Sequence, residues 1–489
     1  MIEDVVVVGS GPNGLAAAVT LARAGLKVVV LERSDYAGGG ASTRELVMPG
    51  VRNDVCSAVH PMAISSDFFR RFALAERVEM LVPEISYGQP IRAAEAAIAY
   101  QDLERTAEGL GADADAWRRL FTPFERHPER LADIIGRPML RVPTEPLSLL
   151  QFGLRALVQG TPAWNLPFSG SDAPALLAGV FAHTIRRQPS LGTSAAGLAL
   201  AAFAHSVGWP IPRGGSGAIS DAMIADLEAH GGRVETGTEV RSLDELAGTR
   251  IVMLDITPHA LLQLAGHRMP EWFAASMRRF RYGNGVAKAD FVLSEPVPWA
   301  NEELRRAVTV HVGGTRAQVA RAENQVAAGM HADEPYVLTC QPTVIDQSRA
   351  DDGQHVLWAY THVPAGSDVD ETEAMVRRIE QFAPGFRDTI IASTARTGRQ
   401  MHAENPNYIG GDIASGAASA WQLVARPRLT TEPWSTPLPG TYLCSASTVP
   451  GPGVHGQAGW LAACRALEHE YGISTPPDLS PDSTTEGKQ

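Results

Sequence analysis

Two apolar runs near the start of the chain predict neighbouring buried strands. The first is Val5–Val8, and the second is Lys27–Leu31, which is rich in valine. Short continuous runs of β-branched residues are typical of strands that are covered on both faces. Between them, the small apolar stretch Leu15–Ala24 predicts a helix that Gly25 ends. The start of the chain is therefore expected to form a strand–helix–strand unit.

The rest of the pattern alternates between two kinds of structure. Residues 66–205 are expected to be largely helical, whereas the later part of the chain returns to strands and helices. The later predicted elements are a helix at 218–230, strands at 233–236, 250–256, 285–293, 356–362 and 441–445, and a small-residue helix after a Gly/Pro turn.

This order predicts an α/β fold in which one domain is inserted into another. We expect a Rossmann-like domain that is built from three separated segments and an inserted α+β substrate-binding domain. The end of the chain is rich in Pro, Ser and Thr and is expected to be a disordered tail. The expected boundaries are 1–65, 206–284 and 400–473 for the Rossmann-like domain, 66–205 and 285–399 for the inserted domain, and 474–489 for the tail.

The turn between the first strand and the first helix has the spacing of a dinucleotide-binding loop. It reads Gly9-Ser10-Gly11-Pro12-Asn13-Gly14, and Glu32 ends the next strand. In such a loop the first glycine allows the tight turn, the second lets the backbone approach a pyrophosphate, and the third lets helix pack on strand. The acid at the end of the second strand accepts hydrogen bonds from a ribose. The alternative is a glycine-rich turn that binds nothing.

Composition narrows the class of protein. The chain has 489 residues and a net charge of −12, which argues against a nucleic-acid partner held through its phosphates. Its four cysteines show no C-x-x-C spacing, so neither a disulfide framework nor a metal site is indicated. The first residues are not typical of a signal peptide, and no apolar stretch reaches the roughly 18 residues needed to span a bilayer. A cytoplasmic enzyme is expected, with peripheral membrane contact left open.

A second glycine cluster follows the acid and makes the assignment more specific. Arg33, Gly39, Gly40 and Ala41 belong to the stretch Glu32–Thr43, which resembles the Gly-Gly extension of the flavin amine oxidase and phytoene desaturase superfamily. The extension brings a second loop to the same pyrophosphate. Gly40 stands where many members carry arginine, so it is open whether backbone amides alone hold the phosphates there.

Two later segments extend this resemblance and imply that the cofactor is FAD. The segment 211–240 is similar to a loop, helix and strand of the phytoene desaturases, in which the backbone at the position of Val240 contacts the FAD adenine; an ordinary hairpin edge is the alternative. The segment 443–456 resembles their flavin-binding turn, with Ser445, Gly453, Val454 and His455 as candidate contacts. The nearest branch is that of the pyridine nucleotide-disulfide oxidoreductase domain-containing protein 2. No second G-x-G-x-x-G is present in a strand context, so a separate NAD domain is not expected.

Lys288 is the candidate catalytic residue. It lies in a predicted strand, in a setting similar to that of the amine oxidase lysine that holds a water at flavin N5. The alternative is a structural lysine paired with Asp290. Among the histidines, His60 and His455 are candidates either for the flavin edge or for turn contacts. His362 shares a strand face with aromatic residues, and His205 is expected to be a satisfied helix residue.

The resemblance implies an FAD-dependent oxidoreductase of the phytoene desaturase-like group, with a hydride passing to flavin N5. The expected partners are a small lipophilic substrate, isoprenoid by one hypothesis, and an electron acceptor such as oxygen or a quinone. Pro138–Pro167 mixes leucines with arginines and either lines an entrance that touches lipid or packs inside the inserted domain. Two alternatives remain open: an amine or amino-acid oxidase, and a flavin-stabilised binding protein without turnover.

Overall fold

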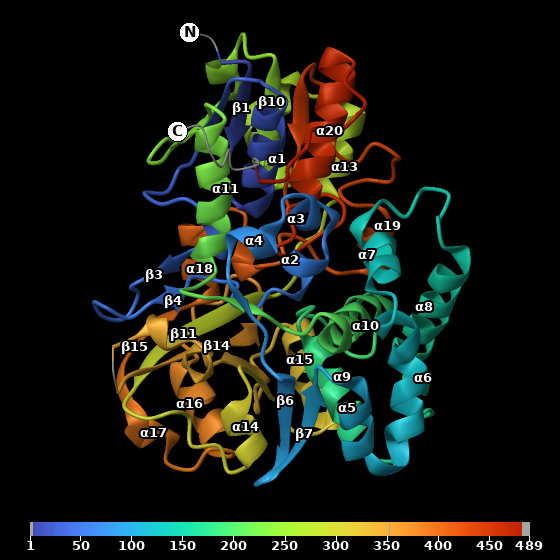
Figure 1. Cartoon of the computed structure of the whole chain (residues 1–489), viewed down its shortest axis with the longest axis vertical. Helices are drawn as coiled ribbons and strands as arrows, with labels where there is room; N and C mark the ends of the chain where they lie inside the picture. The colour runs from blue at the N-terminus through green and yellow to red at the C-terminus, as the bar shows by residue number, and fades with distance from the viewer. Residues whose placement is uncertain (1–2, 352, 482–489) are drawn as a thin grey trace, which may run out of the picture.

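The computed structural model describes residues 3–351 and 353–481 and contains two large sheets. The first sheet lies in the upper part of Figure 1 and is parallel throughout. Its strands all fall in the segments 1–65, 206–284 and 400–473, so distant parts of the chain meet in one Rossmann-like layer. In spatial order they are β16 (Thr441–Leu443), β10 (Ile251–Leu254), β1 (Val5–Val8), β2 (Val28–Leu31) and β9 (Arg233–Glu235).

Helices cover both faces of this sheet, as the uninterrupted valine runs predict. Side chains alternate along a strand, so Val5 and Val7 pack into one apolar cluster and Val6 and Val8 into another. The first cluster includes residues of α1 (Pro12–Arg23), α11 (Gly217–Ala229) and α20 (Gln457–Tyr471), and the second includes α12 (Pro258–Ala265) and α13 (Glu271–Arg278).

The second sheet has seven strands and is antiparallel except where β12 meets β6. It forms the lower part of the molecule in Figure 1. Its strands, in spatial order, are β15 (Ile390–Arg396), β11 (Gly285–Leu293), β14 (His355–Val363), β13 (Val337–Cys340), β12 (Thr309–Val312), β6 (Ile85–Arg92) and β7 (Glu95–Tyr100).

The prediction that residues 66–205 are largely helical is wrong for residues 80–100. Strands β6 and β7 lie there, and β5 (Met80–Leu81) pairs with β8 (Ile211–Pro212). Gly88 and Pro90 weaken the strand signal of β6, because both residues are disfavoured inside a sheet. Short helices precede these strands, and the longer helical part that follows them comprises α5 (Leu103–Gly109), α6 (Ala114–Glu125), α7 (Pro128–Gly136), α8 (Pro146–Gln159), α9 (Asp172–Ala182) and α10 (Leu191–Ser206).

Short elements complete the fold and connect its two halves. A two-stranded sheet joins β3 (Thr43–Arg44) to β4 (Asn53–Asp54). The remaining α-helices are α2 (Pro61–Ser65), α3 (Asp67–Arg71), α4 (Leu74–Arg77), α14 (Glu302–Arg306), α15 (Arg316–Ala327), α16 (Thr372–Glu380), α17 (Phe386–Thr389), α18 (Gly398–Glu404) and α19 (Ala420–Val424).

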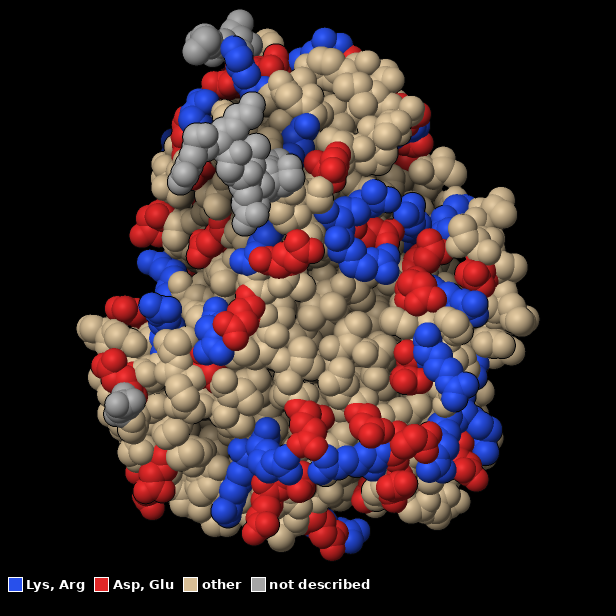
Figure 2. Space-filling view, viewed as in Figure 1, with Lys and Arg blue, Asp and Glu red and all other residues tan. Residues whose placement is uncertain are grey.

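Part of the expected C-terminal tail lies within the described residues. Leu479 is buried against the first sheet's apolar cluster, while residues 482–489 of the expected disordered tail lie outside the described residues. On the face drawn in Figure 2, acidic and basic side chains lie next to one another, and a broad uncharged area crosses the middle. No helix in the described part of the chain has the length and apolar character needed to cross a membrane.

Candidate active site

A large cavity of about 1260 Å³ joins the two halves of the molecule. One end lies at the carboxyl ends of β1, β2 and β10, where parallel sheets of this kind bind ligands. The other end extends between α8, α10 and the seven-stranded sheet. Single-ligand sites usually occupy ~300–1,000 Å³. This cavity therefore has room for a cofactor and a substrate together.

The two glycine loops meet at the first end of the cavity. Gly9 has a φ of +98°, which only glycine adopts readily, and it makes the turn out of β1. A Cβ on Gly11 would lie 2.5 Å from the Asp255 carboxylate, and a Cβ on Gly39 would lie 3.2 Å from the Gly11 α-carbon. A Cβ on Gly14 would collide with the Gly9 carbonyl. The loops thus form a tight backbone cradle that side chains would fill.

Two carboxyl groups lie at the ends of the central strands. Glu32 accepts hydrogen bonds from the backbone N–H and hydroxyl of Ser10, at 2.9 and 2.7 Å, and from the N–H of Ser34 at 2.8 Å. Its orientation beside the cavity is therefore fixed. Asp255, which was not among the predicted site residues, directly follows β10 and accepts a hydrogen bond from Gly14 N–H at 3.1 Å. Burial raises the pKa of Asp255 to about 7, and the charge of Glu32 adds to the shift. Its position at the end of a third parallel strand was the signal that could have identified it.

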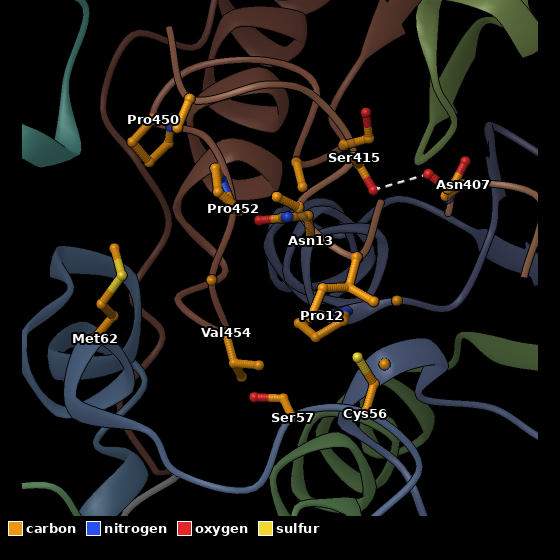
Figure 3. Close-up of a pocket in the computed structure, with 18 of the residues that line it drawn as sticks. Pro12, Asn13, Cys56, Ser57, Met62, Asn407, Ser415, Pro450, Pro452 and Val454 are labelled. Atoms are coloured by element: carbon orange, nitrogen blue, oxygen red, sulfur yellow. Dashed lines mark hydrogen bonds between the residues drawn. The ribbon is translucent and has the colours of Figure 1, made fainter. Parts of the chain in front are cut away.

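The helix α1 begins at the cradle and leaves a polar atom for a ligand. Asn13 is buried and lines the cavity, and its Oδ1 has no partner among the described residues. Figure 3 shows Pro12 and Asn13 near the C-terminal turn that carries Pro452 and Val454. A Cβ on Gly459 of α20 would collide with the Asn13 carbonyl, so the two helices approach closely. An unpaired buried amide and a helix N-terminus at a glycine cradle fit a dinucleotide pyrophosphate.

Tyr408 occupies the space beside Gly40 in the second loop. A Cβ on Gly40 would collide with the Tyr408 hydroxyl, and Cys56 borders the same position. Arg33 donates to the backbone carbonyls of Ala403 and Glu404 at 3.3 and 3.1 Å, so its guanidinium is tied to the end of α18. The place that a side chain at position 40 would take is thus filled by a tyrosine that comes from far along the sequence.

Most of the predicted cofactor residues line this one cavity. Gly14, His455 and the predicted catalytic residue Lys288 do not. Whether the lining residues contact the cofactor stays a prediction. The predicted residues that line the cavity are Gly9, Gly11, Pro12, Asn13, Glu32, Arg33, Gly39, Gly40, Ala41, Val240, Ser445, Gly453 and Val454.

The two histidines considered for the flavin edge differ in their surroundings. His455 is committed to its own turn, because its Nε2 donates to Gly451 O at 3.0 Å and its Nδ1 accepts from Gln457 N–H at 3.0 Å. His60 lines the cavity, and its Nε2 lies 2.7 Å from the Ser216 hydroxyl. Burial lowers the pKa of both histidines to about 4, so both rings are neutral. The structure places only His60 at the cavity wall.

Lys288 lies behind the cavity wall and is paired. Its Nζ lies 2.5 Å from both carboxylate oxygens of Asp290, and both side chains are buried. Arg396 approaches the same carboxylate at 3.4 Å. Trp358, whose ring centre is 5.5 Å from Nζ, lines the cavity in its place. Asp290 is thus the partner expected if Lys288 is a structural lysine. A role for Lys288 at the flavin stays a prediction.

The far end of the cavity is walled mainly by apolar side chains. Trp358 and Tyr360 of β14 line it with ring centres 5.0 Å apart at 81°. His362, on the same strand face, does not line it and is hydrogen bonded to Glu323 at 2.6 Å. His205 is satisfied by Trp117 and the Tyr100 carbonyl, as expected. Further apolar lining residues are Met62, Ile134, Phe152, Leu154, Leu157, Leu200, Phe203, Trp209 and Leu338.

Comparison with known proteins agrees with this geometry. Residues 4–102 match the family of FAD dependent oxidoreductases. Over 94% of this chain and 92% of the relative, the sequence is 24% identical to the pyridine nucleotide-disulfide oxidoreductase domain-containing protein 2 of Rattus norvegicus. Hydroxyneurosporene desaturase of Cereibacter sphaeroides is 30% identical over 33% of each chain. A solved putrescine oxidase bound to putrescine shares the fold, with a TM-score of 0.60 and 16% identity over 95% of this chain and 98% of that chain.

The fold, the paired glycine loops and these comparisons define a flavoenzyme of the oxidoreductase class. The chain is an FAD-dependent oxidoreductase and is homologous over most of its length to the pyridine nucleotide-disulfide oxidoreductase domain-containing protein 2. Its cofactor is FAD, and the prediction of a Rossmann-like fold built from separated segments is confirmed.

Proposed function

We propose that this enzyme oxidises or isomerises a lipophilic substrate in the apolar end of the cavity, and that the cradle residues hold FAD at the other end. The observation that carries the proposal is a single cavity whose first end is built from glycine backbone and fixed carboxylates and whose second end is built from apolar helices. When bound, FAD supplies the hydride acceptor, N5.

The chain's own residues supply binding, orientation and exclusion of water. Phe152, Leu200 and Phe203 provide a wall in which a hydrocarbon gains about 25 cal/mol for each Å² removed from water. The N-terminus of α20 follows the Gly453–Gly456 turn, whose residues Gly453 and Val454 line the cavity. The positive end of the helix dipole therefore lies beside the proposed flavin site. That end would stabilise negative charge on a reduced flavin.

Helix α8 provides the entrance for such a substrate. Its exposed face carries Leu147, Leu150, Leu154 and Leu157, which are 50–64% exposed and follow helical spacing. The last three also line the cavity, so the same side chains face solvent and the interior. This arrangement supports the hypothesis that the segment Pro138–Pro167 touches lipid at the mouth of the apolar end of the cavity, which we call the chamber.

An amine oxidase is the second candidate. The fold shared with putrescine oxidase and the aromatic wall of Trp358 and Tyr360 favour it. The rings of this pair are nearly perpendicular, and the carboxylates that line the cavity come from its FAD end: Glu32, Glu239, Asp255 and Glu404. A substrate ammonium at the apolar end would thus lack a carboxylate among the described lining residues, which favours the lipophilic class.

Anaerobic mixing tests the proposal. The FAD-loaded enzyme is mixed with terpenoid alcohols and hydrocarbons and, separately, with putrescine, and flavin absorbance near 450 nm is followed. Bleaching by a lipophilic compound supports the proposal, and bleaching by putrescine alone supports an amine oxidase. Reoxidation by oxygen or by a quinone then identifies the acceptor. A flavin that no compound reduces, although lipophilic ligands bind, would indicate a binding protein without turnover.

A further inference from the structure

We propose that His183, together with the polar sheet face behind it, binds a neutral oxygen of the substrate, either a hydroxyl or a carbonyl. The inference rests on the proposed function, because it assumes that the apolar end of the cavity receives the substrate. It goes further by assigning the chemical group that this end recognises and the residue that recognises it.

The inner face of two strands near this end is polar although it is buried. Tyr87 and Gln89 of β6 and Thr309 and His311 of β12 are at most 1% exposed. Val310 pairs with Gly88, so the residues on either side of this pair share the opposite face of the sheet. The ring centres of Tyr87 and His311, 5.0 Å apart, confirm that they do.

Each of these four side chains has a polar atom without a hydrogen-bond partner in the part of the chain that the structure describes. The atoms are Tyr87 Oη, Gln89 Oε1, Thr309 Oγ1 and His311 Nδ1. An unsatisfied buried polar group costs about 1–3 kcal/mol, so four on one face call for a ligand or ordered water. Thr309 also lines the cavity, which brings this face to the chamber.

Helix α9 covers the polar face closely. A Cβ on Gly179 would collide with Gln89 Oε1 and would lie 2.8 Å from His311 Nδ1. Glycine therefore lets the helix approach two of the unpaired atoms directly. The next residue with access to both the polar face and the cavity is His183, immediately after the helix ends.

His183 connects the polar face to the chamber. Its Nε2 lies 2.9 Å from His311 Nε2, and its ring packs edge-on against Trp209, with centres 5.3 Å apart. Both His183 and Trp209 line the cavity. Nε2 is occupied and Nδ1 has no hydrogen bond among the described residues, so Nδ1 is the ring nitrogen left for a ligand.

The charge state of His183 and His311 determines which kind of substrate group they can bind. Burial lowers the pKa of His183 to about 3 and that of His311 well below its usual range. Both imidazoles are neutral at physiological pH, so they can donate or accept a hydrogen bond but cannot neutralise a carboxylate. A hydroxyl or carbonyl on an otherwise hydrocarbon molecule fits this wall.

A matched pair of ligands tests the inference on the FAD-loaded enzyme. N-phenyl-1-naphthylamine is bound as a fluorescent probe and displaced by 1-decanol or by 1-fluorodecane, which is nearly the same size but a poor hydrogen-bonding partner. The quantity of interest is the ratio of the two displacement constants. We expect His183→Phe to lower the preference for the alcohol about fivefold, the value of one neutral hydrogen bond, while 1-fluorodecane binds as before.

Two further variants keep the result interpretable. Leu154→Ala should weaken both ligands equally and leave the ratio unchanged, because Leu154 offers only apolar surface. His183→Gln should retain part of the preference, and it replaces the Phe variant if thermal unfolding shows that variant to be misfolded. An unchanged ratio in His183→Phe, with tight binding of both ligands, would overturn the inference alone. If neither ligand displaces the probe from the wild-type enzyme, the proposed function fails and the inference fails with it.

Discussion

The two ends of the cavity are built on different principles. The first end, where we propose that FAD binds, is built around two glycine loops near the start of the chain, and distant residues such as Asp255 and Tyr408 pack against them. The apolar end has no such pair of loops close in sequence: it is assembled from helices and strands that are far apart in the chain, as the contact of His183 with His311 illustrates. Side chains added at Gly11, Gly14 or Gly40 would collide with neighbouring atoms at the first end, whereas the second end is lined mainly by apolar side chains.

Gly11→Val should have the largest effect, because it fills the cradle. The added side chain would meet the Asp255 carboxylate and block the approach to the pyrophosphate. We expect the purified variant to be colourless. The matched control is Gly109→Val, since a Cβ at Gly109 meets nothing within 4 Å. A yellow Gly11→Val protein with FAD bound as tightly as in the wild type would contradict the cradle.

Lys288 requires a double variant, because its removal alone takes away the nearest ion-pair partner of the buried Asp290 carboxylate and leaves it with Arg396, at 3.4 Å. Such a loss costs about 3–5 kcal/mol of folding stability. With Lys288→Met and Asp290→Leu combined, we expect a folded, FAD-loaded enzyme whose flavin is reduced by substrate about 10²-fold more slowly. Stopped-flow absorbance measures this rate. An unchanged rate would leave Lys288 with a structural role only.

Asp255 should make FAD affinity depend on pH. Its pKa of about 7 means that the carboxyl is protonated below that pH and ionised above it. Ionisation would place a negative charge beside Gly11 and Gly14, the loop that would hold the anionic pyrophosphate, so FAD affinity should fall as pH rises through 7 and beyond, by at most tenfold per pH unit. Asp255→Asn should flatten the profile when Kd is measured by FAD fluorescence from pH 6 to 9. A wild-type profile that is already flat would show that this carboxyl does not feel the cofactor.

Gly40→Ala should destabilise the second loop, because its Cβ would collide with the Tyr408 hydroxyl. Overpacking of this kind costs about 1–3 kcal/mol. Tyr408→Phe removes the obstructing oxygen and should restore most of the loss in the double variant. Thermal unfolding of the four proteins measures the coupling. Additive effects would mean that the two positions do not interact.

Leu154→Ala should have the smallest effect, since it trims one side chain at the mouth of the chamber. If α8 contacts lipid, the variant should co-float with anionic vesicles less than the wild type, by about fivefold or less for the lost apolar surface. Leu429→Ala is a suitable control, because Leu429 is exposed and does not line the cavity. A wild-type protein that stays entirely in the soluble fraction would rule out lipid contact at this helix.

The sequence predicted the strands and the glycine loop at the first end of the cavity because their signals are local. The glycine spacing, the valine runs and Glu32 lie within 32 residues, and the strands β9, β10 and β16 follow from apolar runs. The chamber could not be predicted in the same way. Nothing near His183 indicates that it meets His311, and the helical reading of residues 66–205 concealed β6, which carries Tyr87 and Gln89. Tyr408 likewise reaches Gly40 only through tertiary packing.

The most direct test of a two-part cavity is a titration of the enzyme-bound flavin under anaerobic conditions. A cell extract is separated into lipid-soluble and water-soluble fractions, and each is added to the FAD-loaded enzyme while absorbance near 450 nm is recorded. We predict that the lipid-soluble fraction bleaches the flavin and that the water-soluble fraction does not. Bleaching by the water-soluble fraction alone would contradict a lipophilic substrate in the apolar chamber.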